Sequence, residues 1–202
     1  MANLYYQGHG SFRITTDEGF VIYVDPYAGD GYDLPADLIL VSHGHHDHNC
    51  VALPAKKPAC TVLTYQELLA DQKYDSKTVG PVRIDAVQAY NKNHPRTQCV
   101  GFVLFFNGIS LYAAGDTSTT EDMRCRLPQM HLDYALLPTD GVYNMGPQEA
   151  GSCAAMIAAR CSIPIHTKPG ALFDEAVAKR FDAPGKMVIK PGQSVALKAL
   201  SR

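Results

Sequence analysis

The sequence predicts a mixed α/β fold in which two sheets are covered by helices. Short alternating or apolar runs recur from the start of the chain, helical patterns are weak before Gly146, and strand and helix patterns return after it. No long polar linker or low-complexity segment divides the 202 residues, so we expect one domain over residues 1–202.

Seven strands are predicted before residue 114, because apolar residues alternate or run together in short segments bounded by turn residues. These segments are residues 11–15, 20–24, 38–41, 61–63, 82–87, 100–106 and 109–113. Asn107-Gly108 provides the positive φ angles of a two-residue turn, so the last two strands form a predicted hairpin. A second hairpin is predicted between residues 187–189 and 194–197, with its turn at Pro191-Gly192.

Three helices are predicted. Pro147 occupies a first-turn position, where proline is favourable, and opens a helix with an apolar face. That face consists of Ala150, Cys153, Ala154, Ile157 and Cys161. Residues 64–70 and 172–181 are the other two segments, and the second has acidic residues early and basic residues late, as the helix dipole favours.

The composition excludes several classes of protein. Apolar residues make up 46% and charged residues 19%, which is typical of a globular chain. The net charge of −2 provides no general field for nucleic acid or an anionic membrane, so neither is an expected partner. A basic, apolar leader and a membrane-spanning apolar run are both missing, so we expect a cytoplasmic protein, with a homo-oligomer left open. The six cysteines have no CxxC spacing and are expected to be reduced.

A cluster of metal-binding side chains follows the predicted buried strand 38–41. Its sequence is Ser-His-Gly-His-His-Asp-His, residues 42–48. Imidazole and carboxylate groups at a strand end can surround zinc, manganese or iron, and Gly44 is expected to let the backbone turn between them. The alternative is a metal-scavenging surface tract, but such tracts are not preceded by a buried strand.

The HxHxDH pattern in this cluster resembles that of the metallo-β-lactamase superfamily, and the later motifs of that superfamily follow in order at His94, Asp116 and His166. The resemblance runs from Gly8 to about Gly170 and implies a four-layer αββα sandwich. Within the superfamily the chain is similar to the L-ascorbate 6-phosphate lactonase branch. The segments that carry this similarity are GHGSF (8–12), VDP (24–26), AGDT (114–117), LLP (136–138) and GVYNM (141–145).

The resemblance implies a two-metal site with seven ligands. His43, His45 and His94 would hold one ion, Asp47, His48 and His166 the second, and Asp116 would bridge them. Zinc is the expected metal, with manganese and iron as alternatives. Taken singly, His94 before proline and Asp116 after glycine also fit turn residues; their joint order favours the ligand interpretation.

Four other residues near these motifs have separate expectations. His46 occupies the variable position of the motif and is expected to point away from the metals or to line the rim. Cys50 is expected to be a small buried residue rather than a ligand. For His9, a hydrogen bond to a ligand and simple packing are equally consistent with the sequence. His131 has no motif around it and is expected at the surface.

The implied chemistry is hydrolysis of an ester-type bond, a lactone or a phosphoester, by a hydroxide that bridges the two metals. Asp47 is the expected catalytic residue, which orients this hydroxide and accepts a proton. Little chain follows Gly170, which favours a small-molecule substrate. Two alternatives stay open: a di-iron redox protein, although such proteins have Glu at the His45 position and a fused flavin domain, and a non-catalytic metal-binding module, which is expected to lose ligands.

Three basic side chains are predicted to bind a negatively charged substrate. Lys92 and Arg96 each lie two residues from His94, and Lys168 lies two residues after His166. A local positive cluster would attract an anion, and Arg can bind phosphate or carboxylate through two parallel hydrogen bonds. The alternative is that these side chains are simply solvated.

Overall fold

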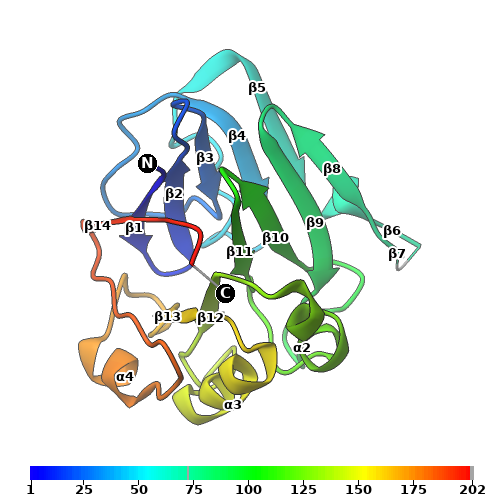
Figure 1. Cartoon of the computed structure of the whole chain (residues 1–202), viewed down its shortest axis with the longest axis vertical. Helices are drawn as coiled ribbons and strands as arrows, with labels where there is room; N and C mark the ends of the chain where they lie inside the picture. Colours follow the sequence, from blue (N-terminus) through cyan, green and yellow to red (C-terminus); the bar gives the residue numbers. More distant parts are fainter. Residues whose placement is uncertain (72, 201–202) are drawn as a thin grey trace.

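The computed structural model describes residues 1–71 and 73–200, which form two six-stranded mixed sheets, a small two-stranded sheet and short helices (Figure 1). The first sheet has, in spatial order, β14 (Ser194–Ala196), β1 (Asn3–Gly8), β2 (Ser11–Thr15), β3 (Val21–Val24), β4 (Ala36–Val41) and β5 (Lys56–Thr64). The second has β13 (Cys161–Ile165), β12 (Tyr134–Pro138), β11 (Ile109–Ala113), β10 (Val100–Phe106), β9 (Val82–Gln88) and β8 (Ser76–Val79). The third pairs β6 (Leu69–Ala70) with β7 (Lys73–Tyr74). The helices are α1 (Tyr65–Leu68), α2 (Glu121–Cys125), the 3₁₀ helix η1 (Leu127–Met130), α3 (Pro147–Ile157) and α4 (Glu175–Arg180).

The main core lies between the two large sheets. Successive strand side chains point to opposite faces, so alternate residues of β4 divide between two clusters. Leu38 and Leu40 are fully buried in one cluster with Phe102 and Leu104 of β10. Ile39 and its neighbours pack on the other face. The predicted fold class, two mixed sheets with helices, is confirmed.

The two outer faces of the sheets are covered differently. The outer face of the second sheet buries Val103 and Tyr112 against Ala150 and Ile157 of α3. Figure 1 shows α2, α3 and α4 together at the lower end of the molecule. On the first sheet, among the described residues, loop side chains such as Tyr32 and Val51 pack on the outer cluster. The helical covering is therefore concentrated on the second sheet.

The seven predicted strands are all present, and so is the first hairpin, in which Asn107 and Gly108 have φ angles of 48° and 73°. The second hairpin was wrong. β14 pairs with β1, with Asn3 opposite Ala196, while Met187 donates its backbone N–H to Ser162 of β13. The turn at Pro191-Gly192 therefore separates residues 187–189, which lie beside β13, from β14, which pairs with β1 of the other sheet.

The helix predictions were correct in position but too long. The predicted helix 64–70 ends at Leu68 and continues as β6, and α4 begins only after the N-cap Asp174. Cys161 is not on the α3 face, because α3 ends at Ile157 and Ala158 adopts a left-handed conformation with φ 55°. Cys161 instead begins β13.

The six cysteines are free thiols. Cys50 was expected to be buried but is half-buried, and its thiol contacts the backbone oxygen of His46. No helix within residues 1–71 and 73–200 is both long and apolar enough to cross a membrane.

Candidate metal centre

The predicted ligands gather where strands of both sheets end. His43 follows β4, His94 follows β9, Asp116 follows β11 and His166 follows β13. β9, β11 and β13 run in the same direction, so their carboxyl ends meet at one edge. Crevices at such edges are the usual ligand sites of open α/β sheets.

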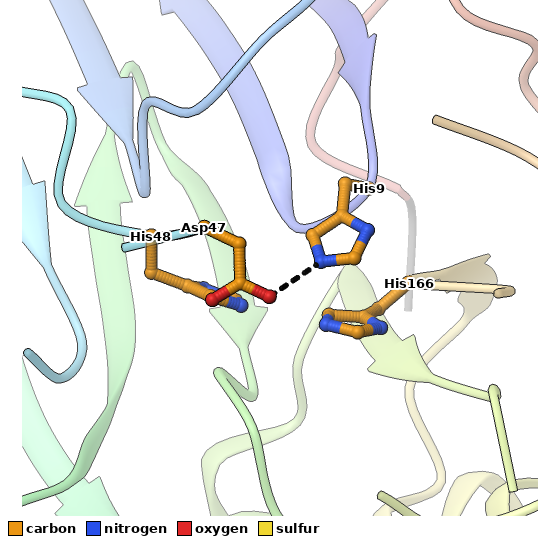
Figure 2. Close-up of side chains that lie close together, drawn as sticks. All are labelled: His9, Asp47, His48 and His166. Atoms are coloured by element: carbon orange, nitrogen blue, oxygen red, sulfur yellow. Dashed lines mark hydrogen bonds and ion pairs between the residues drawn. The ribbon is translucent and has the colours of Figure 1, made fainter. Parts of the chain in front are cut away.

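The side chains form two groups around one carboxylate. One ring nitrogen each of His43, His45 and His94 lies within 4.8 Å of the others. A second group with the same spacing contains His9, Asp47, His48 and His166 (Figure 2). Asp116 lies between the groups: its carboxylate oxygens are 3.3 Å from Nε2 of His48, 3.3 Å from Nε2 of His94 and 3.5 Å from Nε2 of His166.

Several of these atoms are buried without a hydrogen-bond partner. They are Nε2 of His43 and His48, both ring nitrogens of His166, and Oδ1 of Asp116; Nδ1 of His166 has an ion-pair contact with Asp140 and no hydrogen bond. A buried polar atom without a partner is costly, and clusters of such atoms in a native fold indicate a missing ligand. Imidazole nitrogen and carboxylate oxygen suit zinc, manganese and iron, so the residues present fit two divalent ions.

Each of three histidines is oriented through its other ring nitrogen. Nδ1 of His48 donates to Asp25 at 2.9 Å, and Nδ1 of His94 donates to the Asn91 side chain at 2.9 Å. Nδ1 of His43 lies 3.0 Å from the Ser42 hydroxyl, which itself donates to Asp25. Contacts of this kind fix the ring and leave Nε2 available for a metal.

His166 is positioned by Asp140, whose carboxylate oxygen lies 3.1 Å from its Nδ1. The other oxygen of Asp140 accepts backbone N–H groups of Val142 and Tyr143, each at 2.7 Å. The same carboxylate therefore holds both a candidate ligand and the loop of residues 141–145. His166 itself has a φ of 44°, a strained angle of the kind that occurs at functional sites.

His9 is a site residue whose role the sequence left open, and the structure shows the hydrogen bond. Its Nε2 lies 3.1 Å from Oδ2 of Asp47, as the dashed line in Figure 2 marks, and its Nδ1 lies 3.1 Å from the Ala171 backbone oxygen. The ring is fully buried, and its centroid is 3.6 Å from that of His166. The only sequence signal for this role was its place in the GHGSF segment.

The electrostatics keep the carboxylates ionised. Burial raises the pKa of Asp116, but the charges of His48 and His166 outweigh it and bring the pKa well below the usual range. Burial also lowers the pKa of His48, yet the carboxylates of Asp116 and Asp25 together raise it to about 9. Burial lowers the pKa of His43 to about 2, so its ring is neutral at any ordinary pH.

His46 and Gly44 differ from the candidate ligands around them. The His46 side chain is 87% exposed and lines the rim, which is one of the two expected positions. Gly44 was expected to provide a special backbone turn, but it is not among the glycines with positive φ, so the loop does not require glycine there. Gly10 does have a steric role next to a candidate ligand, because a Cβ there would lie 2.7 Å from the His48 ring.

A pocket of about 440 Å³ opens on these side chains. It is lined by Tyr27, His45, His46, Asp47, Asn93, His94, Asp116, Tyr143, Pro169 and Gly170.

The structure does not bring the three predicted cations into the lining of this pocket. Lys92 and Arg96 are exposed, and the Arg96 guanidinium lies 5.3 Å from the centre of the Tyr90 ring. Lys168 is 58% exposed, with Nζ 3.8 Å from Asp174. A role for them in substrate binding stays a prediction.

Two mixed sheets with a cluster of His and Asp side chains where their strands end define a class of metal-binding folds. The chain belongs to the metallo-β-lactamase superfamily, because the family model described as "Beta-lactamase superfamily domain" matches residues 3–166. The chain is 31% identical over 192 residues to a protein of Rubrobacter xylanophilus named UPF0173 metal-dependent hydrolase, covering 80% of this chain and 79% of the relative.

Two solved structures share the fold. Igni18, a metallo hydrolase from Ignicoccus hospitalis, superposes with a TM-score of 0.77 at 20% identity over 98% of both chains. CmlA, a diiron β-hydroxylase from Streptomyces venezuelae, has a TM-score of 0.70 at 12% identity, over 97% of this chain and 54% of that one. The similarity to the lactonase branch stays a prediction.

Proposed function

We propose that this chain is a metal-dependent hydrolase that uses two divalent ions, with zinc the favoured metal, to cleave an ester-type bond in a small molecule. A lactone or a phosphoester is the favoured bond. The observation that carries the proposal is the pair of ligand groups joined by Asp116, with buried Nε2 and Oδ1 atoms that lack partners. The hydrolase name of the Rubrobacter relative supports it.

The residues divide into two sets. His43, His45 and His94 would hold one ion, Asp47, His48 and His166 the other, and Asp116 would contact both. When bound, two such ions make water acidic enough to ionise near neutral pH and polarise a carbonyl or phosphoryl oxygen.

Asp47 is the proposed catalytic residue because it is the candidate ligand carboxylate that reaches solvent. Its side chain is 24% exposed and lines the pocket, whereas that of Asp116 is 4% exposed. Burial raises the pKa of Asp47, but the hydrogen bond from His9 to Oδ2 and the charge of His48 together outweigh it and lower that pKa, so the carboxylate is ionised. The ionised carboxylate is the form that would orient the attacking water through Oδ1 and accept its proton.

The pocket volume sets the size of the substrate. About 440 Å³ is in the range of small-molecule sites, which supports a small substrate.

The test combines elemental analysis with a hydrolysis screen. Metal-reconstituted protein is assayed on a generic lactone, phosphodiester and thioester, with His43→Ala, Asp116→Ala and His46→Ala in parallel. We expect clearly more than one equivalent of metal and hydrolysis of the lactone or the phosphodiester. His43→Ala and Asp116→Ala should lose metal and activity together, while His46→Ala keeps most of both. Metal content near zero after reconstitution would overturn the proposal.

The same preparations test the alternative of a di-iron redox protein. This alternative is kept because the diiron β-hydroxylase CmlA shares the fold. A di-iron centre absorbs visible light and zinc does not. Iron-loaded, coloured protein with no hydrolysis of any substrate class would favour the redox function instead.

A further inference from the structure

We propose that the pocket selects substrates with an uncharged aromatic group next to the scissile bond, and that Tyr27 and Tyr143 hold this group. The inference rests on the proposed function and names the substrate class of the same site. It is an alternative to the predicted anionic substrate and is drawn from the pocket lining.

Two tyrosines are among the residues that line the pocket. Tyr27 follows β3 and is half-buried, with its ring centroid 5.2 Å from that of His9. Tyr143 lies on the loop of residues 141–145, far from Tyr27 in the sequence. Its side chain is 52% exposed, and few large apolar side chains of the described residues are so exposed. Pockets lined by aromatic side chains beside a few polar groups are typical of small-molecule sites, and ring pairs stabilise each other beyond simple burial.

The loop that carries Tyr143 is fixed to the metal centre. The Tyr143 backbone oxygen accepts hydrogen bonds from the side-chain amides of Asn91, at 2.9 Å, and Asn93, at 3.0 Å. Its backbone N–H donates to Asp140. Asn91 also orients His94 and Asp140 lies against His166, so the backbone of Tyr143 is fixed relative to both ligand groups. Supporting contacts of this kind give a binding residue a defined position.

The lining offers little to an anionic tail. No lysine or arginine is among the residues that line this pocket in the described chain, and its imidazoles are the proposed ligands His45 and His94 and the exposed His46. Apart from the proposed metals themselves, a carboxylate or phosphate on the non-reacting part of the substrate would lose water there without gaining a cationic side chain. An uncharged ring loses little water and gains contact with both tyrosines.

Binding of a hydroxamate series to zinc-loaded protein tests this without turnover, because the hydroxamate group chelates the metal while the tail varies. The probes are acetohydroxamate, hexanohydroxamate, phenylacetohydroxamate and the monohydroxamate of succinic acid, measured by calorimetry. We expect the phenyl probe to bind most tightly and the succinic probe no better than acetohydroxamate. Tyr143→Ala should weaken the binding of the phenyl probe about fivefold to tenfold and leave the affinity for acetohydroxamate unchanged.

The neighbouring residue supplies the matched control. Val142 is 55% exposed but does not line the pocket, so Val142→Ala should leave the series unchanged. Tyr143→Phe keeps the ring and should retain the preference, and Tyr27→Leu should reduce it. Equal affinity for the four probes, or preference for the succinic probe, would overturn the inference and leave the hydrolase proposal standing. If no probe binds and zinc does not load, both fall together.

Discussion

Asp25 lies outside the predicted ligand set but contacts both ends of the histidine cluster. Its carboxylate contacts Nδ1 of His48 and accepts the backbone N–H and the hydroxyl of Ser42. It has a φ of 46°, which a non-glycine residue adopts only where the surroundings enforce it. Asp25 thus orients the residues at the start and the end of the histidine cluster.

We therefore expect Asp25→Asn to lower zinc affinity by about 10- to 100-fold, because His48 loses its orienting carboxylate. The measurement is a competitive zinc titration against a chromophoric chelator. Asp33→Asn is the control: Asp33 is an exposed carboxylate paired with Arg13 away from the ligands, and its loss should leave zinc affinity unchanged. Equal affinity of the Asp25 variant and the wild type would contradict the prediction.

The raised pKa of His48 gives metal binding a defined pH dependence. In the metal-free protein its pKa is about 9, above the unfolded value, so its protonated ring stabilises the fold fully below about pH 6.5, and this contribution is lost as the pH rises through about 9. Zinc needs the neutral ring, so binding at pH 7.5 should release a proton, and apparent affinity should rise up to about pH 9. Zinc calorimetry in buffers of different ionisation enthalpy measures the release; no buffer dependence at pH 7.5 would contradict it.

At the residue scale, the sequence predicted the proximity of side chains that belong to one short motif. His43, His45, Asp47 and His48 stand close together in the chain, so their proximity could be predicted. Asp25 and Asp140 could not be, because each approaches its histidine only after distant strands have paired. Asp25 lies in the VDP segment that carries the family resemblance, but that segment does not indicate which side chain its carboxylate contacts, and Asp140 has no such segment.

At the scale of elements, a turn specified by adjacent residues could be predicted, but the pairing of strands far apart in the sequence could not. The hairpin at Asn107-Gly108 is specified by two adjacent residues. The partner of β14 is β1, at the other end of the chain, so the nearby residues 187–189 were a plausible but wrong choice. β13 was missed because Pro164 interrupts its pattern; it is the edge strand of its sheet, where proline is tolerated.

The hairpin turn offers a clean stability test. Gly108 has a φ of 73° and no atom within 4 Å of where a Cβ would lie, so Gly108→Ala introduces backbone strain without a clash. We expect it to lower the free energy of unfolding by about 1–2 kcal/mol, measured by urea denaturation. The control is Gly44→Ala, where φ is not positive and the nearest atom is 3.9 Å away, which should be close to neutral. The reverse order would show that Gly44 has the backbone role first expected of it.

At the scale of the molecule, each candidate ion is shared between the sheets. His43 and His45 come from the end of the first sheet and His94 from the second. Asp47 and His48 likewise join His166 of the second sheet. Bound ions would thus join the sheets at the edge of the core they share.

Metal removal should therefore destabilise the whole fold. Free zinc at 100 times its dissociation constant stabilises a single site by about 2.7 kcal/mol, which corresponds to roughly 5–10 °C in Tm for a chain of this size. Calorimetric melting of chelator-treated and zinc-restored protein measures the shift. Asp116→Ala should show little response to zinc, and an identical Tm for the two wild-type samples would contradict the prediction.

The sharing of ligands between sheets also bears on when the chain acquires its metals. During translation the histidine cluster leaves the ribosome early, while His166 is made only after most of the chain. The proposed set of His43, His45, His94 and Asp116 is complete by residue 116, but the set that contains Asp47 and His48 lacks His166 until β13 has been synthesised and docked. An ion caught there by the nascent chain would exchange readily, so lasting loading of this second position would follow translation, and the ions available to the finished fold would decide its metal.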